Sequence, residues 1–395
     1  MLQEAGTPAH RLEGLVLACA DRLGVRVTLF SLPTWINLSI GEEGQQRSIN
    51  FRVDPGSPKL AMLEETYIVA DRVARGELDA EQGVTALARV RSRLARLGLP
   101  ASSLGYALFS TGAAFFLGGS WIDMACAFPV GIVVGAAMAL AVGRRERELL
   151  SEFAAAAIGT LAAALIVRMV RASDLEASAA IVSLAGLVTL LPGLSLATAM
   201  SELSTRNLAS GSARLIGAMT TLVVVGMGAG IGDRLALLLG LPRHSSFVVP
   251  ITHTASISVQ LVVALLAIAA GLAIVFQARR RRALFVLASC ALGWVAIRTA
   301  REFGGSELAP VMAAAAIGMV GNLYARLRHR PTLAIVLPGL ALLLPGSIGF
   351  RGMQGLIASD TLAGLSTAIS ALLVAASIAA GLLIANALVP SPRQV

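Results

Sequence analysis

Three carboxylate side chains, Asp123, Glu202 and Asp360, lie in or beside long apolar stretches of this 395-residue chain. At the centre of a lipid bilayer a carboxylate costs about 2.5 to 3.5 kcal/mol, so it needs a partner or a proton there. We therefore predict that these three residues are candidates for proton coupling. The competing interpretation places them at helix ends near the lipid headgroups, where water solvates them.

A second feature is the sequence Leu-Leu-Pro-Gly, which occurs at 190–193 and again at 343–346, each time inside an apolar stretch. A Pro-Gly pair interrupts a helix and frees backbone groups, which are tolerated in a membrane only where protein or a watery cavity surrounds them. The duplication predicts two broken membrane helices, a feature typical of substrate sites in transporters. The same register also pairs Met200 with Met353, Leu203 with Leu356, Asn207 with Asp360, Gly211 with Gly364 and Gly228 with Gly381.

The backbone at such a break has a defined chemistry. The helix before Pro192 ends in free carbonyls, the half-helix after it begins with free N–H groups, and these ends carry opposite partial charges. An amino-acid zwitterion needs both, because its carboxylate binds N–H groups and its ammonium binds carbonyls or a carboxylate. A simple proline kink is the competing interpretation. We predict that the substrate site is lined by Pro192, Gly193, Ser195, Thr198, Asn207, Pro345, Gly346 and Ser347.

The composition favours a membrane protein. Hydrophobic residues make up 56% of the chain, and its formal net charge is +9. The mean hydropathy of +0.77 is too high for an ordinary soluble enzyme of this size. Residues 1–100 are neutral, so the positive charge belongs to the rest of the chain, where it lies in short clusters between apolar runs. This distribution is typical of cytoplasmic membrane loops and argues against a nucleic-acid partner.

The remaining motifs indicate no cofactor, metal or nucleotide. Lys59 is the only lysine, and its neighbours exclude a G-K-[ST] phosphate loop, so ATP-driven pumping by this polypeptide alone is not expected. The three cysteines and four histidines show no metal-ligand spacing. The glycine-rich stretch 226–232 matches no nucleotide-binding loop, and its small-xxx-small pairs predict close helix packing.

Residues 1–100 show the patterns of a small soluble α+β domain that ends at Pro100. Asp79 and Gln82 have the spacing of a capping box, which predicts the start of its last helix. The hydrophobic periodicity predicts one helix near 8–23, three short strands around 25–29, 36–40 and 49–53, and two further helices near 58–75 and 80–97.

From residue 101 onward the chain contains ten apolar segments, most of them long enough to cross about 30 Å of hydrocarbon. The third and eighth segments share the string AAAAIG, and the fourth and ninth carry the Pro-Gly breaks, so the duplication is five helices plus five. The segments lie near 102–119, 122–142, 150–170, 177–203, 210–232, 254–277, 283–300, 307–326, 333–357 and 361–388.

An odd number of spans in each repeat makes the second copy enter the membrane from the opposite side. We therefore predict a mainly α, polytopic membrane protein with ten transmembrane helices, arranged as two inverted five-helix repeats over 101–240 and 241–395. If the α+β domain of 1–100 is cytoplasmic, the outer loops hold about half as many arginines as the inner loops. Arg214 is counted among the arginines of the inner loops. This asymmetry favours cytoplasmic amino and carboxyl termini.

This arrangement resembles the threonine/serine exporter family of bacterial membrane proteins. In the soluble part the resemblance rests on Pro33–Leu38, Arg52–Pro55 and Gly76–Glu81. In the membrane part it rests on Gly118–Asp123 and on the two Leu-Pro-Gly motifs with their downstream partners. The similarity covers most of the chain.

The resemblance implies export of L-threonine and L-serine across the bacterial plasma membrane, driven by the proton gradient. It also implies that this chain is a fused form, because the two halves can be separate polypeptides in relatives. The partners expected are the small-molecule substrate, protons and the lipid bilayer. Homo-oligomerisation and the transport of another small organic acid stay open.

Two rival interpretations belong to other functional classes. A membrane-embedded hydrolase would need a nucleophile elbow, an H-E-x-x-H motif or a Ser/His/Asp order, and none is found, so we expect no enzyme. A structural or sensory protein would use its membrane part only as an anchor, for which ten duplicated spans are excessive. A gate, a regulator and an assembly platform all fit residues 1–100.

Overall fold

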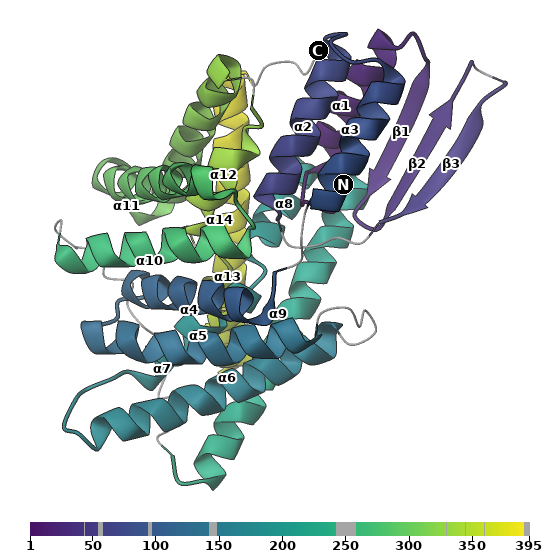
Figure 1. Cartoon of the computed structure of the whole chain (residues 1–395). Coiled ribbons are helices and arrows are strands. Elements are labelled where there is room, and N and C mark those ends of the chain that lie inside the picture. Colours follow the sequence, from purple (N-terminus) through teal and green to yellow (C-terminus); the bar gives the residue numbers. More distant parts are fainter. Residues whose placement is uncertain are drawn as a thin grey trace.

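The computed structural model contains a small α+β domain at the amino terminus and a larger helical part beside it (Figure 1). It describes residues 1–390 apart from 43, 54–57, 94–96, 142–147, 242–257, 329, 344 and 359. Parts of the sequence predictions fall outside the described residues: Asp54 and Pro55, residues 94–96 of the last predicted helix of the amino-terminal domain, residue 142 of the second apolar segment, the beginning of the sixth, and Leu344 of the second break.

The amino-terminal domain packs helices beside a three-stranded antiparallel sheet (Figure 1). Its strands follow the chain order, and their register aligns Leu29, Leu38 and Ile49 on one face, where alternating apolar residues gather. The predicted helices and the three predicted strands are confirmed, with boundaries that differ by a few residues. The elements are α1 (Ala9–Arg22), β1 (Val27–Leu32), β2 (Trp35–Ile40), β3 (Arg47–Arg52), α2 (Leu60–Ala74) and α3 (Ala80–Arg93).

The connection between α2 and α3 has the local chemistry that the sequence indicated. Gly76 has a φ of +75°, a left-handed conformation that glycine adopts without strain and that ends the preceding helix. The N–H of Gln82 donates to Oδ1 of Asp79 at 2.7 Å, and the N–H of Asp79 donates to Oε1 of Gln82 at 3.3 Å. The predicted capping box is therefore confirmed.

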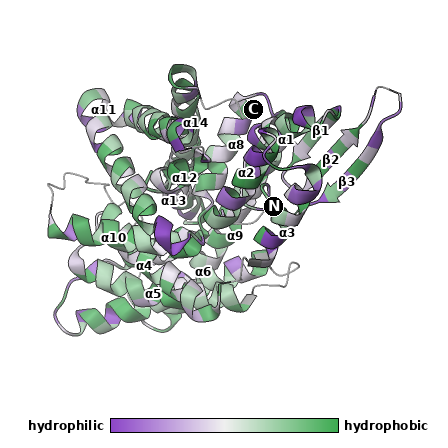
Figure 2. Ribbon diagram, turned by 45° about the horizontal axis from the view of Figure 1, so that its top comes forward, coloured by the Kyte–Doolittle hydropathy of each residue, from purple (hydrophilic) through white to green (hydrophobic). Residues whose placement is uncertain are grey.

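The helical part has the apolar surface of a membrane protein. Figure 2 shows hydrophobic residues along α4 (Leu99–Phe116), α5 (Trp121–Ala141) and α10 (Val259–Val275), whereas hydrophilic residues gather on the amino-terminal domain. Among the described residues, seven helical stretches are long and apolar enough to cross a membrane, or up to eight if a bent pair counts as one span. A multi-pass membrane protein is thus confirmed, while ten spans and inverted repeats stay predictions.

Both Pro-Gly motifs interrupt helices, as the sequence predicted. In the first copy, α7 (Ala179–Leu187) continues into the short 3-10 helix η2 (Val188–Leu190), and α8 (Gly193–Ser204) follows, with a bend of 53° at the break. In the second copy, α12 (Leu333–Ala341) and α13 (Pro345–Ile357) are two helices, but within the described residues they form one apolar stretch, Leu333–Ile357, without a comparable bend. Each motif therefore starts a new half-helix.

The seventh and eighth apolar segments form two separate membrane-length stretches, as the sequence predicted. The element labelled α11 (Ala283–Arg328) contains both, but Gly305 has the non-helical angles φ +68° and ψ −173°, and the two stretches are Arg280–Gly305 and Glu307–Arg328. A glycine adopts this conformation without strain, so the chain changes direction there with almost no connecting loop. The predicted break between 300 and 307 is therefore confirmed, and it is shorter than expected. The 3-10 turn η3 (Arg280–Arg282) precedes α11.

The remaining helices show matching contacts in the two halves. α9 (Leu208–Leu238) follows α8, and α14 (Thr361–Leu388) follows α13. A Cβ added to Gly211 of α9 would lie 2.9 Å from the backbone nitrogen of Leu203, and a Cβ added to Gly364 of α14 would lie 2.6 Å from that of Leu356. The pairs that share one sequence offset thus occupy equivalent helix contacts.

The glycine-rich stretch of α9 packs helices, as predicted. Gly228 and Gly232 face backbone carbonyls of α6 (Glu148–Arg171) so closely that neither position has space for a Cβ. Gly226 faces the side chain of Met353 on α13 in the same way. Small residues at these positions let the backbones approach, which strengthens packing inside a membrane.

Candidate functional site

The two breaks meet in space, backbone against backbone. A Cβ added to Gly193 would lie 2.9 Å from the backbone nitrogen of Gly346, and a Cβ added to Gly346 would lie 2.9 Å from that of Gly193. Both glycines are buried. Residues 153 positions apart in the sequence thus form one junction, at the starts of α8 and α13.

This junction has a specific electrostatic character. Each half-helix begins with N–H groups that lack an intrahelical partner and that carry a partial positive charge. Because α8 and α13 start at the same place, two positive helix ends face one another. An anionic group such as a carboxylate would relieve their repulsion, and backbone N–H groups at helix starts are suited to bind it.

The prolines and hydroxyl side chains predicted to line the site lie around this junction. Pro192 precedes the first residue of α8 and Pro345 is the first residue of α13, positions at which proline needs no N–H donor. Ser195 is exposed and Thr198 is half-buried one turn further along α8, so both hydroxyls lie on one face of this half-helix. Ser347 of α13 is only 1% exposed.

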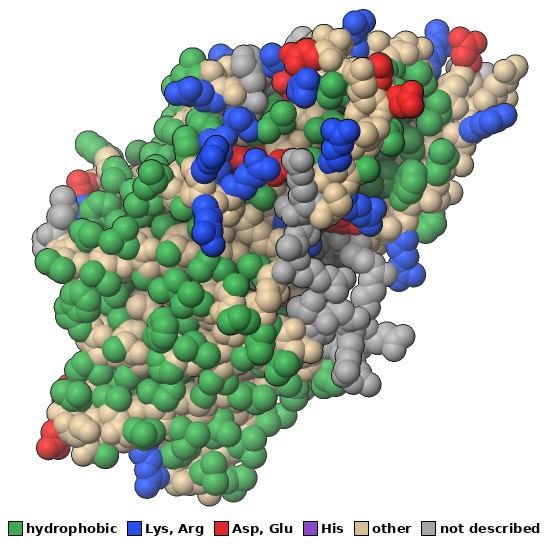
Figure 3. Space-filling view, viewed as in Figure 1, with side chains coloured by type: hydrophobic (Ala, Val, Ile, Leu, Met, Phe, Trp, Pro, Cys, Tyr) green, Lys and Arg blue, Asp and Glu red, His purple; other side chains and the backbone are tan. Residues whose placement is uncertain are grey.

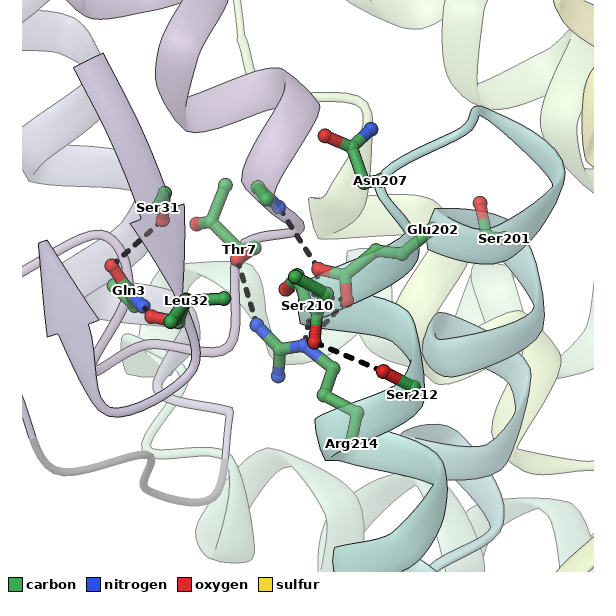
Figure 4. A network of polar contacts seen from close by, with 12 residues as sticks. Gln3, Thr7, Ser31, Leu32, Ser201, Glu202, Asn207, Ser210, Ser212 and Arg214 are labelled. Atoms are coloured by element: carbon green, nitrogen blue, oxygen red, sulfur yellow. Dashed lines mark hydrogen bonds and ion pairs between the residues drawn. The ribbon is translucent and has the colours of Figure 1, made fainter.

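Glu202 lies at the other end of α8, in a buried polar network (Figure 4). Its side chain is fully buried and accepts hydrogen bonds from Arg214 Nε at 3.0 Å and from Ser210 Oγ at 2.8 Å. It also accepts the backbone N–H of Ala9, the first residue of α1, at 3.0 Å. Arg214 in turn donates to the carbonyl of Thr7 at 3.4 Å. One carboxylate therefore holds α8, α9 and the amino-terminal domain together.

The segment before α1 is held at its other end as well. Gln3 donates through Nε2 to the carbonyl of Leu32, and its Oε1 accepts from Ser31 Oγ at 3.1 Å. Both partners belong to β1 (Figure 4). Residues 3–9 thus bridge the sheet of the amino-terminal domain and the end of the broken helix α8.

Asp123 lies at two helix starts and not at the junction. Its Oδ2 accepts the N–H and the hydroxyl of Ser120 at 2.8 and 2.9 Å, and the N–H of Asp123 donates back to Ser120 Oγ at 3.2 Å. Its Oδ1 accepts the N–H of Ser178, the residue before α7, at 2.7 Å. The carboxylate is 5% exposed and joins the starts of α5 and α7.

Asp360 and Asn207, which share the repeat register, occupy equivalent places before a helix. Asp360 precedes α14, is exposed, and accepts the N–H of Ala363 at 3.3 Å. Asn207 precedes α9, and its side-chain nitrogen donates to Thr205 Oγ1 at 3.1 Å. Asn207 comes after the last residue of α8, and Asp360 comes after the last residue of α13. The junction lies at the first residues of these half-helices, so the structure does not bring Asn207 and Asp360 to the Pro-Gly breaks.

The sequence interpretation misses the partners of Glu202. It assigns Arg214 to an inner loop, yet Arg214 lies on α9 with 12% of its side chain exposed. The available signal is its position four residues after Ser210 near the start of an apolar helix, where both side chains share one face. A charged residue there predicts a buried partner.

His10, the second residue of α1, gives the amino-terminal domain a predicted pH dependence. Burial, together with the charge of Arg11, lowers the pKa of His10 from 6.5 to about 4. As the pH falls, His10 is protonated near pH 6.5 in the unfolded chain but only near pH 4 in the folded chain. The unfolded state therefore binds more protons between these pH values, so the stability of the folded state is highest above pH 6.5 and decreases as the pH falls toward 4. We expect the free energy of unfolding to fall by about 2 kcal/mol between pH 6.5 and 5 from this group.

The measurement is thermal unfolding of the purified full chain in detergent at a series of pH values. The variant His10→Gln lacks the titrating ring, so its midpoint should depend less on pH in this range. An identical pH dependence in both proteins would contradict the prediction.

The chain is similar to known membrane exporters. The family described as "Putative threonine/serine exporter" matches residues 1–236, and the one described as "Threonine/Serine exporter, ThrE" matches residues 254–388. A threonine/serine exporter from Corynebacterium glutamicum is 25% identical over 362 residues, which cover 91% of this chain and 73% of that protein. No solved structure matches the chain.

Fungal membrane proteins are also similar. Pheromone-regulated membrane protein 10 of Kluyveromyces lactis is 24% identical over 383 residues, which cover 92% of this chain and 37% of that protein. An uncharacterized protein of Schizosaccharomyces pombe is 25% identical over 372 residues, with coverage of 88% and 46%. The chain thus spans less than half the length of these two relatives.

Proposed function

Because the chain belongs to the threonine/serine exporter family, we propose that it exports small hydroxy amino acids, L-threonine and L-serine, from the bacterial cytoplasm. The observation that carries this proposal is the meeting of two half-helix starts at Gly193 and Gly346. Two such starts supply N–H donors for a carboxylate, and the helix that ends before the first break supplies carbonyls for an ammonium.

Hydroxyl groups near the junction support a hydroxy amino acid as the substrate. Ser195 and Thr198 lie on the accessible face of α8, and Ser347 lies two residues after Pro345. A hydroxyl both donates and accepts, so each can bind the side-chain hydroxyl of threonine or serine. A site built to bind a hydroxyl discriminates against an analogue that lacks it, because its own polar group is then left unpaired.

We assign proton coupling first to Glu202. A proton on this carboxylate would remove the ion pair with Arg214 and weaken its hydrogen bond to Ala9, which would free the end of α8 from α9 and α1. Binding at one end of α8 and protonation at the other would then act on the same half-helix. Asp360 and Asp123 stay candidates, although both carboxylates already bind helix starts.

The membrane topology completes the proposal. We place both termini in the cytoplasm and treat the two halves as inverted repeats that rock against one another around the junction of α8 and α13. The matching contacts of Gly211 and Gly364 support this internal symmetry. The arginine-rich turn Arg280–Arg282 and the polar amino-terminal domain would then face the cytoplasm.

The test is transport by the purified full chain in lipid vesicles. Vesicles loaded with labelled threonine, with an imposed pH gradient that is acidic outside, should release it several-fold faster than vesicles without a gradient. A protonophore should abolish this difference. Efflux that ignores the protonophore would contradict proton coupling, and no efflux above that of protein-free vesicles would contradict threonine export.

A second candidate is a carrier of another small organic acid, because two helix starts bind a carboxylate whether or not an ammonium accompanies it. Competition distinguishes the two. Excess serine should block threonine efflux, whereas lactate, which carries a carboxylate and a hydroxyl but no ammonium, should not. Equal block by lactate would favour the organic-acid carrier.

A further inference from the structure

A cluster of arginines lies where α10 ends and α11 begins, beside helix α2 of the amino-terminal domain. It consists of Arg279–Arg282 and Arg330, and we call it the arginine patch. The N–H of Leu60 at the start of α2 donates to the carbonyl of Phe276 at 2.7 Å, which fixes α2 against the end of α10. Figure 3 shows most of the charged side chains gathered over the amino-terminal domain and the adjoining helix ends, whereas hydrophobic side chains are frequent and charged ones few on the rest of that face.

Two arginines of the patch are bound to α2. Arg282 forms an ion pair with Glu64 at 3.4 Å, and Arg279 forms one with Glu65. Burial raises the pKa of the Glu64 carboxyl, and the charges of Arg282, Arg330 and Arg279 oppose that rise, so all three lie close to it. Five arginines thus share two carboxylates, which leaves a surplus of positive charge.

The surplus is concentrated on the outer part of the patch. Arg280 and Arg281 are exposed and form no ion pair with any residue that the structure describes. The patch also contains a small hollow, which is lined by Glu64, Arg279 and Arg282 together with Phe285 and Tyr324. Exposed guanidinium groups such as those of Arg280 and Arg281 are suited to bind phosphate oxygens two at a time.

An apolar surface follows the patch directly along α11. Leu284 is 76% exposed and Phe285 is 41% exposed, immediately after the arginines. Leu323 and Leu327, near the carboxyl end of α11, are also exposed, and Arg282 of η3 donates to Tyr324 Oη at 3.3 Å, so the two stretches on either side of Gly305 meet at their outer ends. Exposed arginines above exposed leucines are the arrangement expected at the level of lipid headgroups.

We propose that the arginine patch binds an anionic phospholipid of the cytoplasmic leaflet, with its phosphate at Arg280 and Arg281 and its acyl chains along Leu284 and Phe285. Basic pockets between membrane helices on the cytoplasmic side recognise such headgroups. Because Arg279 and Arg282 of the same patch hold Glu65 and Glu64, the bound lipid stabilises the docking of α2 on the membrane part. The lipid therefore couples membrane composition to the position of the amino-terminal domain.

Binding of phosphatidylglycerol to the purified full chain in detergent tests this inference. Native mass spectrometry should find phosphatidylglycerol bound in preference to phosphatidylcholine, and this preference should fall about tenfold in the variant Arg280→Gln/Arg281→Gln. The matched control is Arg89→Gln/Arg91→Gln, which removes two exposed arginines from α3 and should keep the preference.

Two further arms distinguish a lipid site from a site for a soluble anion. Phosphatidylglycerol should raise the unfolding temperature of the wild type and of the control variant, and inorganic phosphate at the same concentration should not. An equal effect of inorganic phosphate would assign the patch to a soluble anion. A full phosphatidylglycerol preference in Arg280→Gln/Arg281→Gln would overturn the proposal. Since neither readout involves transport, failure of this inference leaves the exporter proposal untouched.

Discussion

Alanine at Gly193 or at Gly346 is expected to reduce threonine export by about tenfold or more, while alanine at Gly217 leaves export unchanged. The reason is the close contact of the two half-helix starts. A Cβ at either position would lie 2.9 Å from a backbone nitrogen of the other half-helix, closer than real Cβ atoms come. The starts of α8 and α13 would have to separate, and such overpacking typically costs about 1 to 3 kcal/mol.

Gly217 provides the matched control for this experiment. It lies on α9, and an added Cβ there meets nothing within 4 Å, so Gly217→Ala changes only the local helix propensity. Initial rates of threonine efflux from vesicles, normalised to the amount of folded protein, give the comparison. Wild-type rates in both Gly193→Ala and Gly346→Ala would contradict a transport role for the junction.

Removal of the Glu202 carboxylate is expected to have two separable effects. The variant Glu202→Gln leaves Arg214 buried without its ion pair, a change that typically costs about 3 to 5 kcal/mol of stability. We also expect its threonine efflux to lose its dependence on the imposed pH gradient. The measurements are thermal unfolding in detergent and efflux with and without the gradient.

The double variant Glu202→Gln/Arg214→Gln separates structure from coupling. The double variant has no buried unpaired charge at positions 202 and 214, so it should recover at least half of the stability that Glu202→Gln alone loses. If Glu202 carries the proton, this double variant should still transport without response to the pH gradient. Unchanged coupling in both variants would exclude Glu202 as the proton carrier.

The pair Arg298 and Glu302 on α11 is the control for these measurements. Its atoms lie 3.5 Å apart, and the Glu302 side chain is 65% exposed. Exposed pairs of this kind contribute about 0 to 1 kcal/mol, so Glu302→Gln should change neither stability nor coupling measurably.

Local patterns are sufficient to predict the elements, because each depends on neighbouring residues. The period of the apolar positions predicts the strands and helices of the amino-terminal domain, and Asp79 with Gln82 predicts the cap of α3. The two Pro-Gly motifs predict two interrupted helices. The shortness of the break inside α11 is not predicted, because a single glycine, Gly305, is enough to separate its two helical halves.

Contacts between distant residues cannot be read in the same way. The meeting of Gly193 with Gly346 is expected only from the internal duplication, which is a long-range signal within one sequence. No sequence signal links Glu202 to Ala9. The hydrogen bond between them uses the backbone N–H of Ala9, a group that every residue except proline has, so the residue type does not reveal it. Solvation at a helix end is one interpretation of Glu202 from the sequence, and its full burial contradicts that interpretation.

The length of α8 has a mechanical consequence. Glu202 lies nine positions after Gly193, so about 13 Å of rigid rod connects the two ends. A tilt of about 10° around the glycine would swing the carboxylate by about 2 Å, which is more than a hydrogen bond tolerates. If the junction tilts during the proposed transport cycle, that tilt would break the contacts of Glu202 with Ala9 and Arg214, and the amino-terminal domain would thereby respond to the position of the rod.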